Sequence, residues 1–102
     1  MIDLAALQKR VYQNKVNHGF NITDVPLEFT LAYGELAEAC EAWRKKQDSV
    51  GEELADVLIY LMGLAEILNV DLEKELLRKM EINERRRYIR GDGVLKRVGE
   101  EE

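Results

Sequence analysis

The segment from residue 54 to residue 68 constrains the fold of this chain more than any other feature. Twelve of its 15 residues are apolar, and the exceptions are Asp56, Gly63 and Glu66. A helix that is apolar on nearly every side has to be covered on nearly every side. A chain of 102 residues can scarcely provide that cover alone. We therefore expect this helix to lie near the centre of a homo-oligomer, and its three interruptions argue against a membrane span.

The rest of the chain also has helical periodicity, and no segment shows the alternation of a strand. Asp3 and Asp71 are suitable N-caps, and Ser49 followed by Glu52 has the spacing of a capping box. The four expected helices begin near Asp3, Leu27, Ser49 and Asp71 and end near Gly19, Lys46, Asn69 and Tyr88 or Arg90. Short connections between such helices predict an all-α four-helix bundle. We expect one domain over residues 1–90 and a loosely ordered tail over residues 91–102.

Charge is distributed unevenly along the chain. The formal net charge is −5, which argues against binding to polymeric nucleic acid. Residues 1–77 carry a net charge of −7, whereas residues 78–98 carry +5. An acidic body can hold cations and a basic arm can hold phosphates, although a solvated helix end explains the arm equally well. The single cysteine and the lack of a signal-like N-terminus favour the cytoplasm.

Two pairs of carboxylates interrupt otherwise apolar helical stripes. Glu35 and Glu38 stand three residues apart on the second helix, and Glu53 and Asp56 have the same spacing on the third. Antiparallel neighbours joined by a short turn can bring the pairs face to face, where Mg²⁺ or Mn²⁺ would offset their repulsion. The alternative is that these glutamates are solvated surface residues. Asp56, with apolar residues on both sides in the sequence, is the least suited to that alternative.

The choice of ligands stays open on spacing alone. Glu41 extends the first pair by a further step of three residues, and Glu52 adjoins the second pair. A di-iron bundle would need Glu-x-x-His motifs on two helices, whereas the only histidine, His18, stands at a helix end. A magnesium or manganese site is therefore the metal centre that the residues favour.

Three segments resemble the sequence blocks of the MazG-like nucleotide pyrophosphohydrolases. They are YGELAEACEAWRK (33–45), EELADVLIYL (52–61) and KMEINERRRY (79–88), and their order and separations also match. The resemblance implies an all-α fold, Mg²⁺ as the cofactor and assembly as a homodimer or homotetramer. It also implies hydrolysis of a nucleoside triphosphate to the monophosphate and pyrophosphate.

The resemblance also implies which residues carry the chemistry. The metal ligands would be Glu35, Glu38, Glu53 and Asp56, and the residues facing the phosphates and sugar would be Lys79, Asn83 and Arg86. On a continuous fourth helix, the last three would form one stripe of donors. Many relatives carry a further ligand glutamate at the position of Ala32, so either Glu38 supplies that oxygen or metal binding is weaker.

Two side chains have a predicted role beyond metal binding. Glu38, if it is not fully engaged by metal, can orient or deprotonate the attacking water, which makes it the candidate catalytic residue. Trp43 can stack on a nucleobase, although a contact between subunits fits it equally well. We expect Tyr60 to belong to the core.

The predicted function is that of a Mg²⁺-dependent pyrophosphohydrolase acting on NTPs or dNTPs, with Mn²⁺ as a possible substitute. One alternative is phosphoribosyl-ATP pyrophosphohydrolase, which shares the bundle and the chemistry. The other is a non-catalytic helical module that binds a nucleotide or a protein, in which Ala32 marks a degraded site. The sequence indicates neither the base nor the sugar of the substrate.

Overall fold

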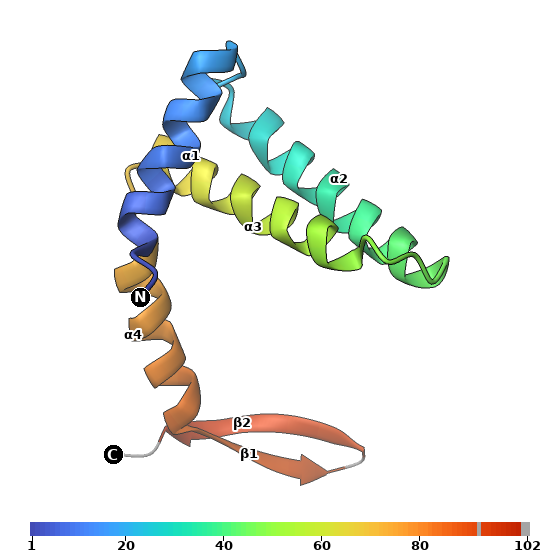
Figure 1. The fold of residues 1–102 in the computed structure, drawn as a ribbon. Coiled ribbons are helices and arrows are strands. Elements are labelled where there is room, and N and C mark those ends of the chain that lie inside the picture. The colour runs from blue at the N-terminus through green and yellow to red at the C-terminus, as the bar shows by residue number, and fades with distance from the viewer. Residues whose placement is uncertain (92, 101–102) are drawn as a thin grey trace. The chain divides into compact units, whose positions relative to one another are not determined.

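A computed structural model of the chain describes residues 1–91 and 93–100. Within these residues there are four helices and a hairpin (Figure 1). The helices are α1 (Leu4–His18), α2 (Val25–Arg44), α3 (Val50–Ile67) and α4 (Leu72–Arg85), and the strands are β1 (Arg86–Gly91) and β2 (Val94–Glu100). The four predicted helices are confirmed. Contacts divide the chain into two compact units, Met1–Leu72 and Glu73–Glu102.

The helix ends of the first unit mostly follow the predicted capping signals. The Asp3 carboxylate accepts a hydrogen bond from the Ala6 N–H, and Gly19 ends α1 with a φ of 70°, a conformation that glycine adopts at little cost. Asp24 caps α2, so this helix begins at Val25, two residues before the predicted start. The predicted capping box of α3 is wrong in one respect, because the Ser49 side chain makes no capping hydrogen bond.

Helix α3 packs against both α1 and α2, and it runs antiparallel to α2 (Figure 1). Small residues of α2 face α3, and the buried apolar residues of the two helices are Ala32, Ala39, Ala42, Met62, Leu64 and Ala65. The cover is incomplete. Leu54, Leu58 and Leu61 remain 53%, 50% and 42% exposed. Two helices of the same chain therefore leave part of α3 open to solvent, which agrees with the expectation from its composition.

The second unit departs from the prediction. Helix α4 ends at Arg85 rather than near Tyr88 or Arg90, and β1 and β2 pair antiparallel from Gly91↔Val94 to Arg86↔Glu100. The prediction that no segment forms a strand is thus wrong. Arginine itself is a good helix former, whereas the Tyr88–Ile89 pair favours extended backbone and pairs with β2. Gly93, with a φ of 76°, permits the turn.

Strand β2 lies within the segment that the sequence predicts to be a loosely ordered tail. Residues 92, 101 and 102 of that tail lie outside the described residues. Among the described helices, none combines the length and the apolarity that crossing a bilayer would require.

Candidate active site

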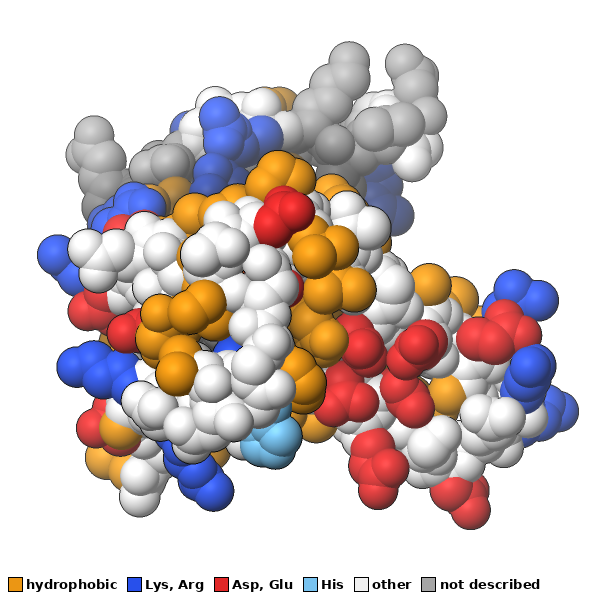
Figure 2. Space-filling model, turned by 90° about the horizontal axis from the view of Figure 1, so that it is seen from above, with side chains coloured by type: hydrophobic (Ala, Val, Ile, Leu, Met, Phe, Trp, Pro, Cys, Tyr) orange, Lys and Arg blue, Asp and Glu red, His pale blue; other side chains and the backbone are white. Residues whose placement is uncertain are grey.

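Three of the predicted metal ligands lie together between α2 and α3. Carboxylate oxygens of Glu35, Glu38 and Glu53 lie within 4.8 Å of one another. The spacing of three residues places Glu35 and Glu38 on one face of α2, and the antiparallel packing of α3 brings Glu53 opposite them. Glu35 and Glu53 are half-buried, and Glu38 is exposed. Figure 2 shows acidic side chains gathered in the right half of the view. We call these three residues the carboxylate cluster.

Asp56 stands at the edge of the carboxylate cluster. Its carboxylate does not belong to the group within 4.8 Å, but its negative charge acts on Glu35. Asp56 is exposed in the isolated chain, although apolar residues flank it in the sequence. Those neighbours point elsewhere because successive residues of a helix face different directions.

The pKa of Glu35 is raised above its ordinary value of 4.5. Partial burial is the largest cause, followed by the charges of Glu38 and Asp56, a hydrogen bond with Glu38 and the charge of Glu53. Like charges this close favour a shared proton or a bound cation. The donors are all carboxylate oxygens, which suit a hard divalent ion such as Mg²⁺ or Mn²⁺. The residues present therefore fit the predicted metal.

Three other residues noted in the sequence do not belong to the carboxylate cluster. Glu41 forms ion pairs with Arg44 at 3.3 Å and Lys45 at 3.4 Å, and is thus engaged elsewhere. The His18 ring contacts the backbone oxygen of Asn14 through Nδ1, within its own helix. Ala32 is buried and lines an apolar groove with Phe29, Tyr33, Leu36, Val57 and Leu61.

The predicted phosphate-binding residues belong to the second unit. Lys79 and Asn83 lie four residues apart on α4 and are exposed, whereas Arg86 is the first residue of β1. The expectation of one continuous helical stripe through all three residues is therefore wrong. The Nε atom of Arg86 is buried and has no hydrogen-bond partner among the described residues.

Trp43 lies on the outer side of α2, with 69% of its surface exposed. It borders an apolar groove together with Leu36, Ala39, Cys40, Val50 and Leu54. Within one chain it is therefore not a core residue. Its indole is available either to a nucleobase or to a second subunit.

The sequence-based predictions do not include one pair of buried charges in the first unit. Lys15 of α1 forms an ion pair with Glu28 of α2, and both side chains are almost fully buried. One sequence pattern does indicate a buried lysine. Lys15 follows Leu7 and Val11 at steps of four residues, so it lies on an otherwise apolar stripe of the helix.

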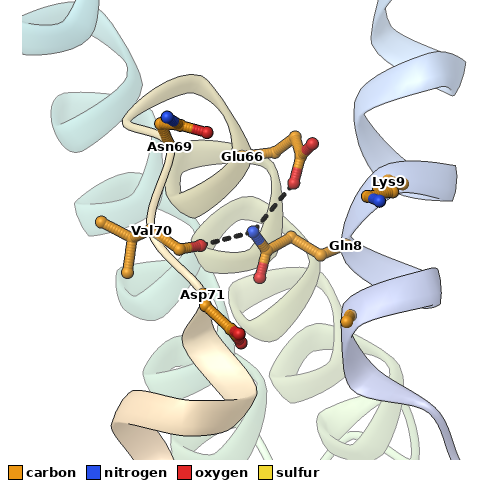
Figure 3. A pocket seen from close by; sticks show the side chains of 7 residues that line it. Gln8, Lys9, Glu66, Asn69, Val70 and Asp71 are labelled. Atoms are coloured by element: carbon orange, nitrogen blue, oxygen red, sulfur yellow. Dashed lines mark hydrogen bonds between the residues drawn. The ribbon is translucent and has the colours of Figure 1, made fainter.

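A further small pocket lies where α1 meets the end of α3 (Figure 3). Gln8 reaches into this junction, and its Nε2 donates to Glu66 Oε2 at 2.9 Å and to the Val70 carbonyl at 2.6 Å. Its Oε1 accepts from the Leu72 N–H at 3.3 Å. Both ends of the Gln8 amide are thus engaged with the protein, and they hold α1 against the segment after α3.

Comparison with known proteins decides the family. The model of the MazG-like family matches residues 28–100. The chain belongs to this family. The carboxylate cluster, Asp56, Lys79, Asn83 and Arg86 all lie inside the matched region of this MazG-like chain.

Relatives of this MazG-like chain include dCTP pyrophosphatase 1 from Homo sapiens, 42% identical over 69 residues, and from Rattus norvegicus, 42% identical over 66 residues. Each match covers 54% of this chain, together with 40% of the human protein and 38% of the rat protein. The chain therefore spans about two-fifths of the length of these relatives. A solved structure, a MazG-like pyrophosphohydrolase of cyanophage S-2L bound to dGDP and three catalytic Mn²⁺ ions per active site, matches with a TM-score of 0.59. It is 26% identical, and the match covers 96% of this chain and 94% of that one.

Proposed function

We propose that this chain is a Mg²⁺-dependent nucleoside triphosphate pyrophosphohydrolase that also accepts Mn²⁺. The observation that carries the proposal is the carboxylate cluster, three acidic side chains from two helices within 4.8 Å in a MazG-like chain. Deoxynucleoside triphosphates are the favoured substrates, because relatives are dCTP pyrophosphatases and the phage enzyme binds dGDP. The Mn²⁺ ions of the phage enzyme support a divalent cation here.

In the proposed reaction, Glu35, Glu38, Glu53 and Asp56 would hold the cation, and the exposed Glu38 would also face the attacking water. When bound, the divalent ion neutralises phosphate charge and makes water more acidic. The water oxygen forms a bond to phosphorus as its proton passes to Glu38, and the phosphoanhydride bond breaks to release pyrophosphate. Exposure of Glu38 to solvent supports this role, since water has to reach it.

We also propose, from the family resemblance, that Lys79, Asn83 and Arg86 contact the substrate. Lys79 and Arg86 are suited to phosphate oxygens, and Asn83 to the sugar. The buried Nε of Arg86 lacks an acceptor within the described chain, which is consistent with an acceptor supplied from outside it. Trp43 is proposed to contact the nucleobase or a second subunit.

We further propose that the active form is a homodimer or homotetramer. Leu54 and Leu58 of α3 are at least half exposed in the single chain, and so are Leu36 and Tyr33 of α2. Contiguous apolar surface on neighbouring helices is typical of subunit interfaces. Light scattering at micromolar concentration tests this, and a monomer under those conditions would contradict it.

The activity is tested with a panel of NTPs and dNTPs in the presence of Mg²⁺, with products resolved by ion-pair chromatography. We expect a nucleoside monophosphate and pyrophosphate in equal amounts from at least one dNTP. No product from any nucleotide would refute the proposal, and hydrolysis of phosphoribosyl-ATP alone would reassign the substrate.

The position of the site is tested by Asp56→Asn, with Glu41→Gln as the matched control on the neighbouring helix. Asp56→Asn should abolish turnover while the helical circular dichroism is retained, because a charged metal ligand is lost. Glu41→Gln should keep turnover, because Glu41 pairs with Arg44 and Lys45 rather than joining the carboxylate cluster. Turnover by Asp56→Asn at the wild-type rate would show that the site is misplaced.

A further inference from the structure

Lys15 joins the three helices of the first unit at one point. Its ammonium forms the ion pair with Glu28 Oε1, and it also lies 5.3 Å from the centre of the Tyr60 ring on α3. The second oxygen of Glu28 accepts a hydrogen bond from Asn21 Nδ2 at 3.2 Å, in the loop between α1 and α2. The charge of Lys15 is therefore balanced by one partner and directed at the face of an aromatic ring.

The surroundings accommodate this lysine closely. The Lys15 and Glu28 side chains are only 10% and 1% exposed. A β-carbon at position 63 of α3 would lie 3.2 Å from Lys15 Cδ, so Gly63 leaves the space that the lysine stem occupies. A buried ion pair adds little stability compared with apolar residues of similar size. Stability alone is thus a weak reason for two buried charges at this place.

Tyr60 lies on the same helix as Asp56, which stands at the edge of the carboxylate cluster. It follows Asp56 by four residues, so the two side chains share one face of α3. Glu28 precedes Glu35 by seven residues, which is about two turns along α2. In agreement with this placement, the pKa of the Tyr60 phenol is raised, first by burial and then by the charges of Glu35, Glu28, Asp56 and Glu38. The ring therefore has Lys15 over one face, and its helix carries Asp56 one turn earlier on the same side.

We propose that Lys15 is a positioning residue of the active site, which holds the Tyr60 ring beside the carboxylate cluster while Glu28 balances its charge. The inference rests on the proposed function, because it assigns Lys15 a part in the same reaction. A cation over the ring face fixes the ring plane, and with it the direction of the phenol group. Loss of the cation frees the ring to move away from the metal ligands.

The test uses the full chain with Lys15→Met and Glu28→Gln combined. Both side chains keep their approximate size, no buried charge is left unpaired, and the new amide oxygen at position 28 can still accept the hydrogen bond from Asn21. The matched control is Arg78→Met with Glu75→Gln, which removes an exposed ion pair of 2.8 Å on α4. If the first combination does not fold, Lys15→Gln with Glu28→Gln replaces it, because two amides can hydrogen-bond to each other.

Activity is measured with Mg²⁺ and the dNTP that the wild type hydrolyses fastest. We expect kcat to fall about tenfold in the Lys15/Glu28 double variant, with KM within about twofold, and the Arg78/Glu75 control to match the wild type. In a Tyr60→Phe background, the same double substitution should cause no additional loss, because Lys15 acts through Tyr60. Wild-type kcat, or a loss that multiplies with that of Tyr60→Phe, would overturn the proposal.

A second readout needs no turnover. Tyrosine rings labelled with ¹³C are observed by NMR while Mn²⁺ alone is added, and Tyr60→Phe assigns the Tyr60 signal among the four tyrosines. Mn²⁺ should broaden the Tyr60 signal strongly in the wild type and several-fold less in the double variant. Equal broadening in both would overturn the positioning role. If the wild type hydrolyses no nucleotide, the proposed function fails, and this measurement still decides the inference.

Discussion

Replacing Glu38 with a neutral residue should make the metal-free protein more stable. It should also reduce the stabilisation that a bound metal ion provides. Oxygens of Glu35, Glu38 and Glu53 lie within 4.8 Å of one another, and Glu38 is exposed. In a water-like dielectric, two unit charges at that separation repel by about 0.9 kcal/mol, and physiological salt reduces this by about half. Glu38→Gln removes two such repulsions, so we expect a gain of about 1 kcal/mol in the free energy of unfolding.

The assay is thermal unfolding followed by circular dichroism, with and without Mn²⁺. A gain of about 1 kcal/mol should raise the Tm of the metal-free variant by about 4–8 °C for a domain of this size. Mn²⁺ at about 100 times its Kd stabilises a single-site protein by about 2.7 kcal/mol. In Glu38→Gln this metal-dependent increase should fall by more than half, because an anionic ligand has become neutral.

Glu41→Gln is the control, because it removes an acidic charge three residues beyond Glu38 on the same helix, α2. Glu41 is paired with Arg44 and Lys45, so its loss should lower the metal-free Tm slightly and leave the Mn²⁺ effect intact. A lower metal-free Tm for Glu38→Gln, or an unchanged response to Mn²⁺, would refute the reasoning that the carboxylate cluster is a repulsive site awaiting a cation.

Three further predictions follow from single features of the structure. The pKa of Glu35 is raised above 4.5 in the folded state, so the folded protein holds more protons than the unfolded one just above that pH. Stability without metal should therefore fall as the pH rises through this range, and urea unfolding should show a smaller decline for Glu35→Gln. Lys15→Met alone leaves the buried Glu28 charge without its partner, so it should lower the free energy of unfolding in urea by about 3–5 kcal/mol. Adding Glu28→Gln should restore most of this loss. Equal losses in the single and double variants would contradict the ion pair. Trp43→Ala should shift the assembly toward smaller species in light scattering if the indole lies between subunits, whereas unchanged assembly with a raised KM would assign it to the nucleobase.

Much of the fold could be predicted from local sequence signals. Helix periodicity and the caps at Asp3 and Gly19 depend on residues within a few positions of each other, and the structure confirms them. The end of α4 could not be predicted in the same way. The run of arginines before Tyr88 and Ile89 carries weak and conflicting local preferences, and pairing with β2 decided the outcome.

The candidate site also combines features that follow from local sequence with features that depend on how the helices pack. The sequence determined that Glu35 and Glu38 share a face, as Glu53 and Asp56 do, because an α-helix repeats about every 3.6 residues. Only the tertiary structure decided that Glu53 joins the first pair within 4.8 Å, and that Lys15 meets Glu28 beside Tyr60. Distances between side chains on different helices depend on how those helices pack, and packing is a sum of contacts across the whole unit that no short segment encodes.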